Sequence, residues 1–239
     1  HIFLQNSNSL KLLSEKGISN CSVAGDTRFD RVNNIAQESK DVPKLSNFIG
    51  KSRTIIAGST WPADEEVLLK IFQHLNKDDL KLVIVPHEVD KERIAELKNK
   101  ISDGYPSLKI ALYSQEQIDP NASILIVDVI GILSSAYKYS TITWVGGGFD
   151  KGIHNILEPA AHGKPVLFGP NFQKFREAHE LISNRSAFSI TDTTTGKLLI
   201  TKLLTDQSLL KQTGESASNY VQSNVGASDK IFNSVFKKG

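Results

Sequence analysis

The chain has 239 residues, of which 39% are hydrophobic and 23% are charged. This composition is that of an ordinary globular protein, and the length is sufficient to bury a full core. The formal net charge is only +2, with the basic residues scattered, which argues against a nucleic-acid-binding protein. The single cysteine, Cys21, excludes an internal disulfide bond.

The chain begins at His1 and contains no methionine. Residues 2–4 already have the pattern of a strand, so we expect a fragment of a longer protein that is entered within a domain. No apolar run approaches the ~18 residues that a membrane span requires, and no signal peptide is present.

Short β-branched runs alternate with amphipathic stretches along most of the chain. Strands are predicted at residues 21–24, 53–57, 80–85, 109–112, 123–127, 141–145, 165–168 and 187–190. Helices are predicted at 7–16, 63–75, 90–101, 132–139, 155–162, 175–182 and 196–204, with one or two more within 206–236. Apolar strands separated by helices indicate an α/β, Rossmann-like parallel sheet with helices on both faces. In such a sheet the loops that follow the strands share one edge, where ligands bind.

The stretch 25–44 precedes the first clear βα unit and is expected to bridge toward another domain. Its beginning, residues 25–31, is dense in charge. A capped helix start with solvated ion pairs would explain it. A functional interpretation places Arg28 against a phosphate leaving group, because a guanidinium can contact two phosphate oxygens at once.

Candidate ligand-binding residues follow two of the predicted strands. Ser59 and Thr60 could bind an anion with their hydroxyls, but a helix cap before Pro62 explains them better. Pro86 and His87 follow the next strand, where a histidine can donate to a phosphate or sugar oxygen. A lone surface histidine without such a role is far commoner.

A third strand ends at Asp128 and is followed by Gly131. Asp128 could cap the next helix, and Gly131 could let backbone amides approach a base or phosphate. The residues leave both interpretations open.

The strongest signal is the run from Trp144 to Glu158. Gly146, Gly147 and Gly148 end an apolar strand, and bare backbone that opens a helix can lie against a phosphate. Glu158, one turn into the helix, is then placed to accept a ribose hydroxyl. The run therefore predicts a nucleotide site.

The end of this run also matches a capping box, in which Asn155 caps the helix and Glu158 bonds back to it. Capping and ligand binding are compatible, because the glycines before the box need a separate explanation.

Other nucleotide-dependent classes fit less well. Gly146, Gly148 and Gly152 give G-x-G-x-x-x-G, one residue longer than the dinucleotide fingerprint, and the next strand ends without an acid for the ribose. No Gly-Lys-Ser/Thr loop and no metal-ligand spacing occur. We therefore expect neither an oxidoreductase nor a P-loop nucleotidase, and no cofactor or metal ion.

Taken in order, these segments resemble the C-terminal half of 3-deoxy-D-manno-octulosonic acid (Kdo) transferases, which build the inner core of lipopolysaccharide. The matching segments are 25–31, 57–62, 86–88, 128–131, 146–149, 152–158 and 168–171, and the likeness runs from about residue 3 to the C-terminus. The family has the GT-B fold, in which two Rossmann-like domains face each other across a cleft and the C-terminal one holds most of the nucleotide-sugar.

The resemblance implies three parts of the chain. Residues 1–24 would be the end of an absent N-terminal domain or an interdomain link. Residues 25–220 would form the nucleotide-sugar donor-binding domain. Residues 221–239 would form a C-terminal helix that packs back toward the N-terminal domain.

The resemblance also implies the reaction. The donor would be CMP-Kdo and the acceptor a lipid A precursor, at the cytoplasmic face of the inner membrane, in an inverting transfer without a metal ion. The family's general base is a glutamate of the N-terminal domain, which also carries the membrane anchor. This chain alone would then bind nucleotide weakly and be inactive.

Site residues follow by position within the resemblance. Arg28 matches a basic residue credited with stabilising the transition state, and Ser59 and Thr60 match a loop that faces the cleft. His87 lies in a shorter run than the Pro-Arg-His-Pro-Glu of many members, so it aligns with either basic residue. The segments that match those holding CMP comprise Pro86, His87, Gly131, Ile132, Leu133, Asn155, Ile156, Leu157 and Glu158.

Two alternatives to a Kdo transferase stay open. One is another GT-B glycosyltransferase or an enzyme like the UDP-sugar 2-epimerases, which share the glycine loop and the ribose glutamate. The other is a nucleotide-binding module without catalytic activity.

Overall fold

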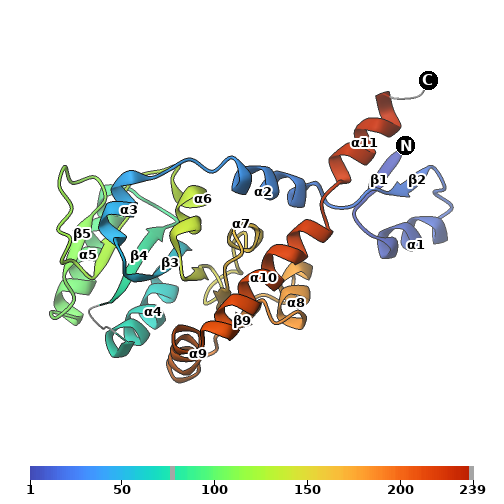
Figure 1. Cartoon of the computed structure of the whole chain (residues 1–239). Helices are drawn as coiled ribbons and strands as arrows, with labels where there is room; N and C mark the ends of the chain where they lie inside the picture. The colour runs from blue at the N-terminus through green and yellow to red at the C-terminus, as the bar shows by residue number, and fades with distance from the viewer. Residues whose placement is uncertain (76–78, 237–239) are drawn as a thin grey trace.

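The computed structural model describes residues 1–75 and 79–236, and its centre is a seven-stranded sheet (Figure 1). The strands lie in the order β5-β6-β4-β3-β7-β8-β9, and every neighbouring pair is parallel. The predicted fold class, a Rossmann-like parallel sheet with helices on both faces, is confirmed.

The predicted strands all form, with small changes at their ends. The sheet contains β3 (Arg53–Thr60), β4 (Leu80–Pro86), β5 (Ile110–Leu112), β6 (Ile124–Ile126), β7 (Ile142–Val145), β8 (Val166–Phe168) and β9 (Ala187–Ser189). The helices that follow β3 are α4 (Pro62–Leu75), α5 (Lys91–Gly104), α6 (Leu133–Ala136) with the short η1 (Tyr137–Tyr139), α7 (Leu157–Ala161), α8 (Arg176–Ser183), α9 (Thr193–Thr205), α10 (Gln207–Ser223) and α11 (Ala227–Phe236). No helix in the described ranges is both long and apolar enough to cross a membrane.

Alternating side chains divide the core between the two faces of the sheet. On one face, Ile55, Leu82 and Trp144 pack with apolar residues of α4, α5 and α9. On the other face, Ile56 and its neighbours pack against α3 and α6, whereas Val145 and its neighbours pack against α2, α7, α8 and α10. Strands buried on both faces explain why the sequence shows continuous apolar runs.

The strand order reverses between β3 and β7. After β3 the chain builds the β4, β6 and β5 side, and then it crosses to β7, β8 and β9 on the other side. Ligands of open parallel sheets bind at the carboxyl ends of the strands at such a reversal. The four junctions singled out in the sequence follow β6, β4, β3 and β7, which are neighbours in this order, so all four lie along one edge as expected.

The N-terminal region departs from the expected sheet. β1 (Ile2–Leu4) and β2 (Cys21–Val23) flank α1 (Ser7–Glu15) and form a separate two-stranded parallel sheet at one end of the molecule, beside α11 (Figure 1). The stretch 25–44 contains α2 (Thr27–Gln37) and leads into α3 (Pro43–Ile49). α2 buries only Phe29 and Val32, which left too few apolar positions to show a helical period.

A buried ion pair links α4 to α5 behind the edge of the sheet. Glu65 is fully buried, pairs with Arg93 and accepts a hydrogen bond of 2.9 Å from the Thr60 hydroxyl. Because a buried carboxylate without its counter-charge is strongly destabilising, we expect Arg93→Met to lower the free energy of unfolding by about 3–5 kcal/mol. Urea denaturation measures this change.

An exposed pair provides the control for this test. Lys70 and Glu66 pair at 2.8 Å on the surface of α4, and Lys70→Met should cost less than about 1 kcal/mol. The double variant Glu65→Leu/Arg93→Met should recover much of the lost stability, because neither charge is then buried alone. Equal losses of unfolding free energy for Arg93→Met and Lys70→Met would show that the buried pair contributes no more to stability than the exposed one.

Candidate functional site

The glycines after β7 are required by contacts between turns. A Cβ on Gly146 would lie 2.2 Å from the carbonyl oxygen of Ser59, and one on Gly148 would lie 2.4 Å from the amide nitrogen of Gly169. The end of β3 and the turns after β7 and β8 therefore meet through bare backbone. The prediction that these glycines open a helix is wrong, because α7 begins only at Leu157.

A buried carboxylate binds the backbone of this glycine turn. Asp64, in the first turn of α4, accepts hydrogen bonds from the amides of Gly147 at 2.7 Å, Trp61 at 3.0 Å and Phe149 at 3.4 Å. Burial raises the pKa of Asp64, and these amides counteract that shift. The Gly147 amide, which the sequence suggested for a phosphate, is thus engaged by an aspartate of the same chain.

Glu158 of α7 links the segment that follows β7 to α6, which follows β6. Its carboxylate accepts a hydrogen bond of 2.6 Å from the Ser134 hydroxyl and one of 3.0 Å from the side-chain amide of Asn155. The side-chain oxygen of Asn155 in turn accepts a hydrogen bond of 3.1 Å from the backbone amide of Leu157. The predicted capping box is therefore wrong in detail. The residue that precedes α7 is Ile156, and Glu158 bonds the side chain of Asn155 rather than its backbone.

The loop after β6 presents exposed backbone before α6. Gly131 has a φ of 97°, and a Cβ there would meet nothing within 4 Å. Ile132 precedes the first helical residue, Leu133. Asp128 does not cap α6, because it binds the amide and hydroxyl of Ser114 at 2.8 and 2.5 Å. Of the two interpretations left open for this loop, the cap fails and an accessible Gly131 backbone remains.

The ends of β3 and β4 are joined more tightly than expected. The Thr60 hydroxyl, predicted as a cap or a ligand contact, donates to Glu65 inside the core. The backbone carbonyl of Thr60 accepts a hydrogen bond of 3.0 Å from the backbone amide of His87, the residue after the buried Pro86. Ser59 has a φ of 52°, a left-handed conformation that is uncommon for a residue with a side chain. Such strain is often found at functional sites.

Arg28 is engaged by two carboxylates. Its guanidinium donates to Asp26 at 2.8 and 2.9 Å and to Glu177 of α8 at 2.7 Å. The hydrogen bond to Asp26, above all, raises the pKa of Arg28. The charged-turn interpretation of residues 25–31 accordingly holds, since Asp26 also caps α2. A phosphate at Arg28 would have to displace a carboxylate.

Three aromatic rings that the sequence did not bring together meet at the centre of the edge. Trp61 follows β3, His87 follows β4 and His154 lies in the loop after β7. His87 stacks on Trp61 with 4.7 Å between ring centroids and on His154 with 4.4 Å. The only feature of the sequence that could have predicted this group is that each of its residues follows a strand of the sheet. Within residues 1–75 and 79–236, no three His, Cys, Asp or Glu side chains are grouped to hold a metal ion.

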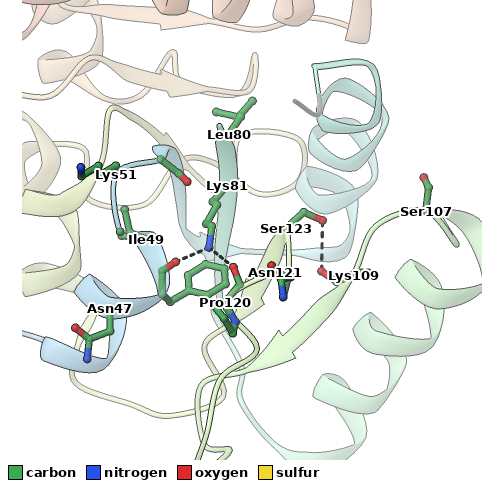
Figure 2. Close-up of a pocket in the computed structure, with 14 residues that line it drawn as sticks. Asn47, Ile49, Lys51, Leu80, Lys81, Ser107, Lys109, Pro120, Asn121 and Ser123 are labelled. Atoms are coloured by element: carbon green, nitrogen blue, oxygen red, sulfur yellow. Dashed lines mark hydrogen bonds between the residues drawn. The ribbon is translucent and has the colours of Figure 1, made fainter. Parts of the chain in front are cut away.

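A cavity of about 620 Å³ opens at the opposite edge of the sheet (Figure 2). It is lined by residues that precede β3, β5 and β6 and by the first residues of β4, Leu80 and Lys81. The ammonium of Lys81 donates to the carbonyl oxygens of Phe48 and Pro120. Burial lowers the pKa of Lys81. None of the predicted site residues lines this cavity, so it is separate from the candidate site.

Replacing two glycines separates packing from backbone strain at the site. Gly147→Ala places a Cβ 2.2 Å from the carbonyl oxygen of Gly152 at a φ of 89°, whereas Gly131→Ala meets no atom at a similar φ of 97°. We expect Gly131→Ala to cost about 1–3 kcal/mol from strain alone. Gly147→Ala should cost clearly more, because the turn must also move. Thermal unfolding measures both, and equal losses would contradict the packing role.

Known proteins are similar to this chain in both sequence and fold. No family model matches the chain. The 3-deoxy-D-manno-octulosonic acid transferase of Rickettsia felis is 29% identical over 247 residues, which cover 99% of this chain and 51% of that protein. The chain thus spans about half the length of the curated relatives it matches.

Solved structures agree on the fold. The C-terminal CMP-Kdo binding domain of WaaA from Acinetobacter baumannii has a TM-score of 0.65 at 21% identity, covering 81% of this chain and 97% of that domain. The MnaA–UDP structure from S. aureus has a TM-score of 0.65 at 19% identity, covering 98% of this chain and 59% of that one. The fold is that of the C-terminal domain of GT-B glycosyltransferases. By its sequence, the chain belongs to the family of 3-deoxy-D-manno-octulosonic acid transferases.

Proposed function

We propose that this chain is the donor-binding half of a Kdo transferase and holds CMP-Kdo at the carboxyl edge of its sheet. The observation that carries the proposal is the junction of Ser134, Asn155 and Glu158, which ties together the two loops that the family resemblance assigns to CMP. The strand order reverses beside this junction, where parallel sheets bind their ligands.

Glu158 is the proposed ribose contact. Each oxygen of its carboxylate accepts one hydrogen bond within the chain and keeps a further lone pair for a ligand hydroxyl. The bonds from Ser134 and Asn155 fix its orientation before a ligand arrives, which lowers the entropy cost of binding. The Gly131 backbone, open to its surroundings, is the proposed neighbour of the base or phosphate.

Other predicted contacts enter the proposal in altered form. Gly146, Gly147 and Gly148 shape the wall of the site by close packing, with the Gly147 amide held by Asp64. Arg28 would stabilise the departing phosphate only after exchanging its bond to Glu177 for one to the ligand. We therefore propose Arg28 as a residue that changes partner during the reaction.

The remainder of the reaction belongs to a part that faces this domain. We propose that a general base from an N-terminal domain activates a hydroxyl of a lipid A precursor, at the cytoplasmic face of the inner membrane and in contact with it. Residues 1–24 are proposed to be the end of that domain or the link to it. Residues 221–239, of which 237–239 lie outside the described residues, are proposed to pack back toward it. Phe232, Val235 and Phe236 support this proposal, because their side chains are exposed on α11, away from the main sheet (Figure 1).

Calorimetry with CMP tests the proposed site. Glu158→Gln keeps the size of the side chain but removes the negative charge that receives the ribose hydroxyl. We expect CMP to bind this variant more weakly by about 1–3 kcal/mol. Glu116→Gln, at an exposed position, is the matched control and should bind CMP as the unchanged chain does.

The same titrations separate the alternatives. Binding of UDP in preference to CMP would favour an enzyme like the UDP-sugar 2-epimerases, and binding of NADH would favour an oxidoreductase. Equal CMP affinity for Glu158→Gln and Glu116→Gln, with only the stability of the former reduced, would leave Glu158 a purely structural role.

A further inference from the structure

The ring group at the centre of the edge contains a hydrogen bond with a fixed direction. The indole Nε1 of Trp61 lies 2.9 Å from Nε2 of His154. An indole nitrogen can only donate, so Nε2 of His154 must be the acceptor and carry no proton. A neutral His154 therefore has its proton on Nδ1, and a doubly protonated ring would place two donors against each other.

The surroundings of His154 favour this neutral state. Burial and, next, repulsion from His87 lower the pKa of His154 below its ordinary value of 6.5. His87 stacks on the ring from the β4 side. Asp64, the carboxylate behind this group, is directed to the amides of Trp61 and Gly147 instead of to the imidazole. Acidification must therefore break the Trp61 bond in order to charge His154.

His154 is also tied to the chain that forms the site. Its backbone amide donates to the carbonyl oxygen of Gly146 at 3.0 Å. Trp61, its partner, directly follows Ser59 and Thr60, the turn that the Gly146 backbone touches. One side chain thus connects Trp61, directly after β3, to the segment that contains Asn155 and Glu158.

We propose that His154 is a positioning residue of the nucleotide-sugar site: as a neutral imidazole it holds Trp61, and with it the turn at residues 59–61, in the geometry that binds the nucleotide. This inference rests on the proposed function. It adds that nucleotide binding is strongest above pH 6.5 and is lost as the pH falls through the lowered pKa of His154. The sign follows because the ordered turn requires the unprotonated ring.

NMR of the isotopically labelled chain tests the hydrogen bond directly. The chain has two tryptophans, so the indole signal of Trp61 can be assigned with the Trp61→Phe variant. We expect His154 to carry its proton on Nδ1 and the Trp61 indole signal to shift with the same midpoint as His154, below pH 6.5. Trp61→Phe should raise that midpoint, because protonation then breaks no bond. A proton on Nε2 of His154 at neutral pH would overturn the inference.

CMP calorimetry tests the consequence for the site. His154→Ala should weaken CMP binding by about fivefold, the effect of one hydrogen bond. His154→Gln should keep most of the affinity, because its amide oxygen can still accept from Trp61. It should also reduce the pH dependence between pH 5 and 7 to the part that comes from the CMP phosphate, which itself ionises with a pKa of about 6. His179→Ala, an exposed histidine on α8, should change neither.

The two experiments distinguish a failure of the proposed function from a failure of the positioning role. If the unchanged chain binds no CMP, the proposed function is wrong, while the NMR titration still decides whether His154 fixes the turn at 59–61. If CMP binds but His154→Gln loses as much affinity as His154→Ala and keeps the full pH dependence of the unchanged chain, the positioning role is wrong and the CMP site stands.

Discussion

Close contact between bare backbones at the reversal of strand order is the constraint on which the candidate site depends. Gly146 lies against the carbonyl of Ser59, and Gly148 lies against Gly169, at distances that leave no room for a Cβ. Asp64 closes the same region by accepting the Gly147 amide. Because these turns cannot separate without losing packed backbone, the loops that extend from them are held at fixed positions.

Much of the fold was predictable because its signals are local. Runs such as 82–85 are apolar throughout, since both faces of β4 are buried, and glycine or proline ends many of them. Parallel strands place their following loops at one edge, so the grouping of the four junctions followed without knowledge of any contact. The N-terminal strands were also found, but their pairing into a separate sheet was not, because a three-residue run does not specify its partner.

The side-chain partners at the site were not predictable, because they come from distant parts of the chain. Glu158 meets Ser134 across 24 positions, Gly147 meets Asp64 across 83 and Arg28 meets Glu177 across 149. Nothing in a local motif distinguishes a guanidinium that awaits a phosphate from one already paired with carboxylates. The grouping of the four junctions at one edge followed from the sequence, whereas tertiary contacts decide which of their polar groups are already bonded within the chain.

A crystal structure of the chain with CMP tests the central claim most directly. The account predicts the ribose at the Glu158 carboxylate and the remainder of the nucleotide beside Gly131, at the carboxyl ends of β6, β4, β3 and β7. Density for CMP at the opposite edge, in the cavity beside Lys81, would contradict the account, as would a nucleotide that makes no contact with Glu158.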